Sequence, residues 1–118
     1  MTVESDIYDC LKGLVGNRCY PDVAKSGSAL PFIVYQQVGG ESPTFLENAL
    51  PSKKNGRYQI TVWSLLRSEA ASIGRQAEAA MVAETDYQAR PLGDFVAVYD
   101  EDTEYRGSRQ DFTVWSTR

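Results

Sequence analysis

The stretch from Asn55 to Ala83 reads NGRYQITVWSLLRSEAASIGRQAEAAMVA. Between Tyr58 and Ser64 apolar and polar side chains alternate, and this period of two predicts a strand. After Ser64 the apolar residues return at steps of three and four, which places them along one stripe of a helix. That stripe consists of Ala70, Ile73, Ala77, Ala80 and Met81. A strand that leads directly into an amphipathic helix is therefore the predicted centre of the domain.

The ends of these two elements also carry signals. Asn55-Gly56 has turn chemistry and is predicted to precede the strand. Ser68 is the expected N-cap of the helix, and Glu69 follows in the first turn, where a carboxylate favours the helix dipole. Because alanine dominates the helical stripe, the helix is expected to approach a sheet closely. The sheet must then supply the bulky side chains of the core.

Length and composition predict one soluble globular domain over residues 1–118. Charged residues make up 24% of the chain and hydrophobic residues 42%, which is far from the composition of a disordered segment. The net charge of -4 argues against general nucleic-acid binding, which needs a basic face. No apolar run approaches the roughly 18 residues of a membrane helix. Because Met1–Asp6 lacks a signal-peptide pattern, an intracellular protein is expected.

Cys10 and Cys19 are the only two cysteines. In a secreted protein they could close a loop, but a reducing compartment favours free, buried thiols, which is the prediction. The chain contains no histidine, so a structural zinc site, which needs about four ligands, is nearly excluded.

The N-terminal residues Thr2–Val15 predict a second helix. Thr2 is its expected N-cap, and Gly16-Asn17 supply the positive-φ residues that end helices. Its apolar residues fall on a single stripe that would face the core. The stripe consists of Val3, Ile7, Cys10, Leu11 and Leu14.

Three further strands complete the predicted fold. Phe32–Val38 is rich in β-branched and aromatic residues, and Phe95–Tyr99 and Arg109–Trp115 follow the central helix. The prediction is an α+β fold in the order α-β-β-α-β-β, with two helices packed on a four-stranded, mainly antiparallel sheet.

The segment Gly39–Lys54 is longer than the about two to five residues of a usual hairpin loop. It holds apolar residues among charged ones, which either pack on the flank of the domain or bind a partner. We expect it to be mobile in the isolated chain and to become ordered against a neighbouring subunit or another partner protein. The predicted partner contacts are Glu41, Phe45, Leu46, Glu47, Leu50, Lys53 and Lys54.

A search for chemistry identifies no catalytic, cofactor-binding or metal-binding residues, so an enzyme is not expected. The usual neutral-pH base is missing without histidine, and there is no glycine-rich phosphate loop. Acidic residues from Asp100 to Glu104, with Asp111, match part of a calcium-loop template. Tyr105 stands where that loop needs glycine and the last ligand is not glutamate, so a solvated hairpin end is favoured over calcium binding.

Two short segments of the chain have similar sequences, Ile60–Ser64 and Phe112–Ser116. The similarity indicates two strands with similar neighbours, because no second helix follows Ser116. Trp63 and Trp115 fall on the face opposite the apolar residues of their strands. If both faces of the sheet are covered, the tryptophans lie under the first helix or an adjoining subunit.

Four segments carry a resemblance to a known family: Asn17–Ala24, Leu30–Tyr35, Arg57–Ser64 and Asp111–Trp115. In this order and spacing they resemble the tail completion or tail-to-head joining proteins of long-tailed bacteriophages. The chain departs from the family pattern at Cys19, where an aliphatic residue is usual, and at Lys25-Ser26, where a proline commonly follows the alanine.

The resemblance implies a small protein with helices on an antiparallel sheet, which forms a ring at the head-proximal end of the tail. It also implies tail-tube and head-connector partners, assembly in the host cytoplasm, and a phage or prophage origin. The family has no catalytic residues to carry over. The alternative function is a stand-alone bacterial protein-binding or regulatory module.

Overall fold

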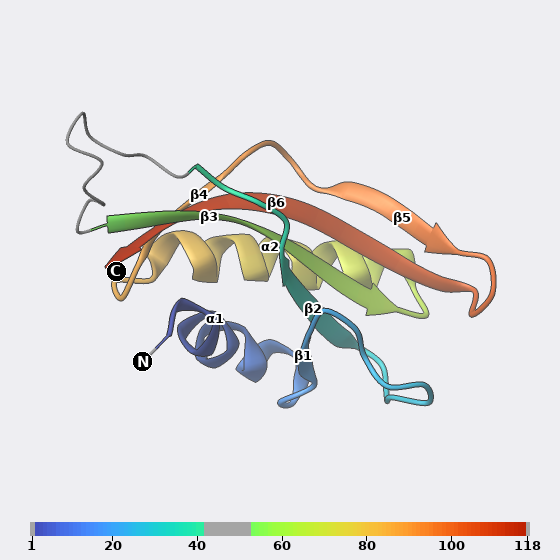
Figure 1. The fold of residues 1–118 in the computed structure, drawn as a ribbon. Coiled ribbons are helices and arrows are strands. Elements are labelled where there is room, and N and C mark those ends of the chain that lie inside the picture. Colours follow the sequence, from blue (N-terminus) through green and yellow to red (C-terminus); the bar gives the residue numbers. More distant parts are fainter. Residues whose placement is uncertain (1, 42–52, 118) are drawn as a thin grey trace.

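The computed structural model describes residues 2–41 and 53–117, which form one sheet with two α-helices (Figure 1). Helix α1 continues into a short 3-10 helix, η1, and α2 links the two halves of the sheet. The elements in chain order are α1 Val3–Leu11, η1 Lys12–Val15, β1 Cys19–Pro21, β2 Phe32–Gln37, β3 Lys53–Ser64, α2 Arg67–Ala83, β4 Gln88–Pro91, β5 Val96–Asp100 and β6 Tyr105–Thr117.

The sheet corrects the predicted strand number. The described residues form six strands in the order β1-β2-β3-β6-β4, and β5 also pairs with β6. The β1–β2 pair is parallel, whereas the other pairs are antiparallel, so the sheet is mixed. Strands β1 and β4 have three and four residues, which is too short for an alternating pattern to stand out in the sequence.

Strands β3 and β6 form the long central ladder, which runs from the Lys53–Thr117 pair to the Ser64–Arg106 pair. The predicted turn at Asn55-Gly56 is wrong, because both residues lie inside β3. Gly56 is required there by close packing, since a Cβ atom would lie 2.6 Å from the ring of Tyr58.

Both helices pack on the same face of the sheet, which we call the helix face (Figure 1). The helical stripes predicted from the sequence supply its core, apart from Cys10, Leu14 and Ala80, which are only partly buried. Strands β3 and β6 contribute apolar side chains from every second position. The most deeply buried apolar residues are Ile7, Leu11, Val15, Ile33, Val62, Met81, Phe112 and Val114.

The helix ends are set by local hydrogen bonds. The Ser5 N–H donates to Thr2 Oγ1 over 3.1 Å, which confirms the predicted N-cap of α1. Ser68 does not cap α2, because the cap is Leu66 and Ser68 lies inside the helix. Among the described residues, no side chain caps α2. Ser64, at the end of β3, joins the strand to the helix: its Oγ accepts from the N–H of Leu66 over 3.2 Å and donates to Glu69 in the first turn.

Cys10 and Cys19 are both free thiols on the helix side of the sheet, as predicted. Cys19 is buried as expected, whereas Cys10 is only partly buried. Neither α1 nor α2, the helices within the described residues, is long and apolar enough to cross a membrane.

Candidate functional site

The second face of the sheet, opposite both helices, carries the side chains that alternate with the core; we call it the open face. The register aligns these side chains in rows across β2, β3, β6 and β4. Both tryptophans belong to this face and are half-buried, so neither lies under the first helix. The open-face residues of the long strands are Gln36, Asn55, Arg57, Gln59, Thr61, Trp63, Arg109, Asp111, Thr113 and Trp115.

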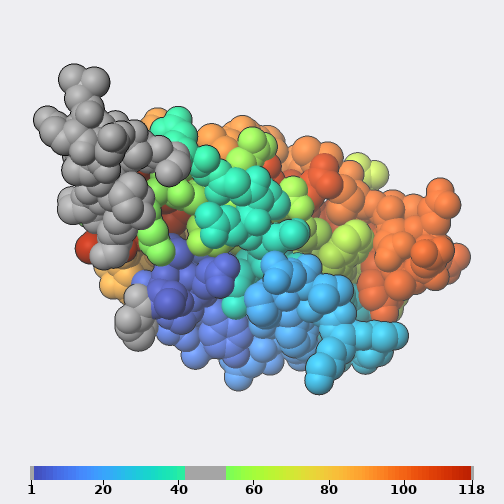
Figure 2. Space-filling model, in the orientation of Figure 1, coloured from blue at the N-terminus to red at the C-terminus, as the bar shows by residue number. Residues whose placement is uncertain are grey.

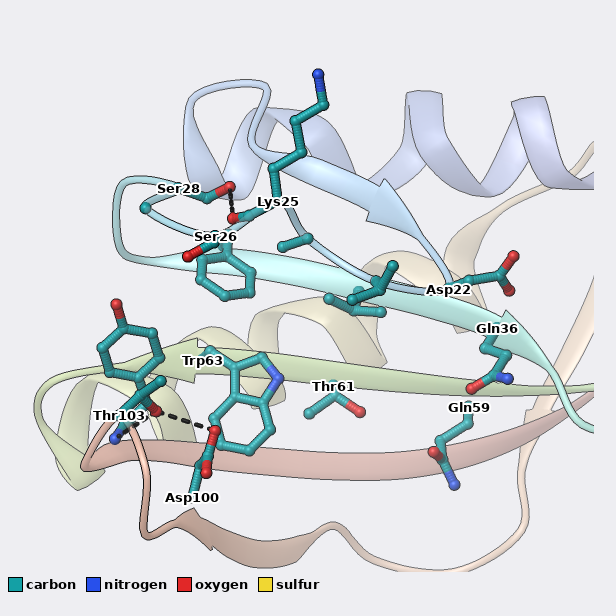
Figure 3. A pocket seen from close by; sticks show the side chains of 16 residues that line it. Asp22, Lys25, Ser26, Ser28, Gln36, Gln59, Thr61, Trp63, Asp100 and Thr103 are labelled. Atoms are coloured by element: carbon teal, nitrogen blue, oxygen red, sulfur yellow. Dashed lines mark hydrogen bonds between the residues drawn. The ribbon is translucent and has the colours of Figure 1, made fainter.

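One end of the open face holds a groove of about 390 Å³ beside Trp63 (Figure 3). Residues 22–28 form one wall and the hairpin between β5 and β6 forms the other. The Trp63 ring lies over Gly107, where a Cβ atom would be 2.9 Å from the ring. Phe32 is beside it, with its ring centroid 6.3 Å from that of Tyr105 in an edge contact. Aromatic side chains therefore form much of the floor.

The other end of the open face holds a groove of about 630 Å³ beside Trp115, the Trp115 groove. Arg57 and Arg90 line it and share one row of the sheet, on either side of Thr113. The Arg57 side chain donates to Asp111 Oδ2 from Nε at 2.9 Å and from Nη2 at 2.6 Å. The groove is therefore polar, with two arginines, the carboxylate of Glu41 and one indole in its lining.

The hairpin between β5 and β6 explains the acidic cluster found in the sequence. Asp100 Oδ1 accepts from the Asp102 N–H over 3.1 Å, and Asp100 Oδ2 accepts from Thr103 Oγ1 over 3.0 Å. These bonds hold a tight turn, in which Glu104 has a φ of 63°. In the part of the chain that the structure describes, no group of three or more acidic or thiol side chains is arranged to hold a metal ion.

The structure places three of the seven predicted partner contacts. Glu41 is exposed and lines the Trp115 groove, where its N–H donates to Asn55 Oδ1 over 2.8 Å. Lys53 is exposed and Lys54 half-buried, and they open β3 opposite Thr117 and Ser116. These residues lie together at one end of the sheet. The other four, outside the described residues, are Phe45, Leu46, Glu47 and Leu50.

The side chains whose pKa values are shifted lie on the helix face. Burial raises the pKa of the Cys19 thiol to about 12. Burial also raises the pKa values of Cys10, Tyr35 and Tyr58. Thiols with raised pKa values are protonated at neutral pH and are poor nucleophiles. The side chains of the open face offer instead hydrogen-bonding groups, guanidinium groups and indoles.

Sequence reasoning found the tryptophans but missed the arginines Arg57, Arg90 and Arg109 as members of one surface. The signal was present for two of them, because Arg57 alternates in phase with Trp63, and Arg109 with Trp115. Arg90 had no such signal, since it lies in the short strand β4.

The fold and this face define a class of protein. It is a small α+β domain whose open sheet face combines arginine and tryptophan, the residue types enriched in protein contact surfaces. The sequence model of the family "Tail completion protein gp17" matches residues 6–117, and the chain belongs to this family. Comparison with curated proteins gives no match. Family membership assigns the chain a structural role in phage tail assembly.

Proposed function

We propose that several copies of this chain form a ring at the head-proximal end of a phage tail and join the tail to the head. The family match over residues 6–117 carries this proposal, because it covers all six described strands, α2 and most of α1. The open face supports it, since a ring subunit needs surface that its own core does not use.

A ring requires two unlike surfaces on each subunit, because head-to-tail contacts close a ring only when different patches meet. The two ends of the open face differ in this way. The groove beside Trp63 is floored with aromatic side chains, and the Trp115 groove contains two arginines. In the proposed particle, the ring contacts a tail-tube protein on one side and a head-connector protein on the other. It assembles in the bacterial cytoplasm and remains in the virion.

The proposal is tested by deleting the gene from the phage or prophage that carries it and supplying the protein from a plasmid. Without the protein we expect filled heads and separate tails, seen by electron microscopy, and joined particles when it is returned. Normal infectious particles in the deletion strain would contradict the proposal. Such particles would favour the alternative function, a stand-alone bacterial protein-binding or regulatory module.

The predicted contacts within Gly39–Lys54 remain part of this proposal. Replacing Phe45 and Leu46 with serine is expected to weaken tail joining and to change the melting temperature little. Val82, which is 52% exposed on α2, supplies the matched control as Val82→Ser. If the double variant melts several degrees lower and joins tails normally per folded molecule, these two residues stabilise the domain instead.

A further inference from the structure

Arginine side chains gather on the open face although the whole chain is acidic, with a net charge of -4. We call Arg57, Arg90 and Arg109 the arginine face. Arg57 and Arg90 share one row of the sheet, and Arg109 lies four residues before Thr113 of that row on β6. Arg57 is paired with Asp111. Within residues 2–41 and 53–117, Arg90 and Arg109 form no ion pair.

A cluster of carboxylates, opposite in charge to the arginine face, lies elsewhere, in the turn between β5 and β6. We call Asp100, Glu101, Asp102 and Glu104 the acidic hairpin. Glu101, Asp102 and Glu104 are exposed and have no ion pair among the described residues. The backbone is fixed by the bonds of Asp100 and by a 2.7 Å bond from the Glu104 N–H to the Asp100 carbonyl. A fixed turn loses little conformational freedom on binding.

One copy cannot bring these two surfaces together. The acidic hairpin lies at one end of the long axis of the molecule, in the orange region at the right of Figure 2. On β6, Tyr105 at the hairpin and Thr113 in the arginine row are eight residues apart, or about 26 Å along an extended strand. The structure measures 51 × 25 × 25 Å. The hairpin and the row of Arg57 and Arg90 are therefore separated along the long axis and can meet only between copies. Arg109 lies midway, four residues or about 13 Å from both Tyr105 and Thr113.

The Trp115 groove has the shape and lining to receive such a turn. Its volume is about 630 Å³, and Arg57 and Arg90 lie in its lining. Leu92, which is 51% exposed, and Trp115 add apolar surface beside the two guanidinium groups. Planar guanidinium groups bind carboxylates through two parallel hydrogen bonds. Arg57 already donates two hydrogen bonds to Asp111, and Glu41 also lines the groove. Arg90, which has no ion pair among the described residues, is therefore the group that favours an incoming carboxylate.

We propose that the acidic hairpin of one copy binds the arginine face and the Trp115 groove of a second copy. This inference rests on the proposed ring and names the contact that would propagate it. Because the two surfaces are unlike, each copy donates a hairpin on one side and accepts one on the other.

The test compares purified full-length variants by native mass spectrometry and light scattering over a range of protein and salt concentrations. The face variant is Arg90→Gln/Arg109→Gln, and the hairpin variant is Glu101→Gln/Asp102→Asn; both neutralise their surface without reversing its charge. The control is Lys12→Gln/Arg75→Gln, which changes the net charge as the face variant does but acts on the helix side. Circular dichroism checks that all variants remain folded.

The wild type is expected to associate at low salt and to dissociate as salt screens the contact. Each test variant should lose self-association by about tenfold or more, and the control should keep it. A 1:1 mixture of the face and hairpin variants should form a dimer that does not grow, because only one productive contact remains.

Three results would overturn the contact: association of both variants at the wild-type level, failure of the mixture to form a dimer, or a wild type that stays monomeric throughout. Binding of the arginine face to a tail-tube protein by a monomeric wild type would assign the groove to that partner instead. None of these results decides whether the protein completes tails, which the gene deletion tests separately. A wild type that stops at dimers, with both variants monomeric, supports the contact and contradicts the ring.

Discussion

The helix face and the open face are built by the same strands but serve different ends. On β6, Phe112 and Val114 are each 1% exposed under the helices. Thr113 and Trp115, which alternate with them, are half-buried on the open face. Because side chains alternate along a strand, one ladder carries two independent sets of residues. The comparison teaches that stability can be concentrated on one side of a sheet, which leaves the other side free to vary for recognition.

Substitutions on the helix face are expected to have the largest effect on the free energy of unfolding. Phe112→Ala should lower the free energy of unfolding by about 3 to 5 kcal/mol, because it removes a buried ring and leaves a cavity. Its neighbour on the open face, Thr113→Ala, loses one hydrogen bond from Asn55 and should cost at most about 1 kcal/mol. Urea denaturation measures both. Equal losses would mean that the two faces do not differ in this way.

The next effect tests how closely α2 approaches the sheet. A Cβ atom at Gly74 would lie 2.6 Å from Ser108 Oγ, so Gly74→Ala should cost about 1 to 3 kcal/mol through overpacking. Ser108 Oγ is buried without a hydrogen-bond partner in the described structure, so Ser108→Ala should be neutral or stabilising.

A double-mutant cycle of Gly74 and Ser108 completes this test. The two changes together should cost less than their sum, because the hydroxyl that obstructs the new methyl group is gone. Strict additivity would show that the cost of Gly74→Ala arises elsewhere in the helix.

The stability of the folded protein should fall progressively at alkaline pH, because groups buried on the helix face ionise. The folded state raises the pKa of Cys19 from 9.0 to about 12, so the unfolded chain releases this proton first. Stability from this group is complete below about pH 9 and is lost as the pH rises towards 12, by about 1.4 kcal/mol per pH unit. Tyr35 and Tyr58 add losses of the same sign, because their pKa values are also raised.

Denaturation at several pH values checks this slope, with Cys19→Ser as the comparison. The variant lacks the thiol titration, so its stability should fall less steeply between pH 9 and 12. An unchanged slope would show that the other groups with raised pKa values, Cys10 and the buried tyrosines, account for the whole pH dependence.

The smallest effect is expected on the open face. The Arg57 side chain is 51% exposed in its pair with Asp111, and exposed ion pairs contribute only about 0.2 to 1 kcal/mol. Arg57→Ala should therefore shift the melting temperature by a few degrees at most. Calorimetry at low and high salt measures it, and a loss comparable to that of Phe112→Ala would place this pair among the determinants of the fold.

The sequence predicted the parts of the fold that repeat a period over many residues. Both helical stripes and the β3 alternation were found this way, and so was the Thr2 cap. Strands β1 and β4 were missed because they are held by their neighbours and not by a pattern of their own. Asn55-Gly56 was misassigned because turn residues also suit a strand whose side chains bond across a polar face, as Asn55 does to Thr113.

The candidate site was less predictable than the fold. Trp63 and Trp115 could be assigned to one face, but their antiparallel pairing, which puts them at opposite ends, needs the register. The groove beside Trp63 also depends on residues 22–28 and on the β5–β6 turn, which come from distant parts of the chain. Contacts between such segments leave no periodic signal in the sequence.

The central ladder also constrains when the protein can fold during synthesis. Each rung joins β3 to β6, from Ser64–Arg106 to Lys53–Thr117. The ribosome must therefore synthesise α2, β4 and β5 before β3 gains its main partner, and the pairing is slow because it is non-local. Until then the buried face of α2 has no complete sheet beneath it, so the nascent chain is a natural client for host chaperones.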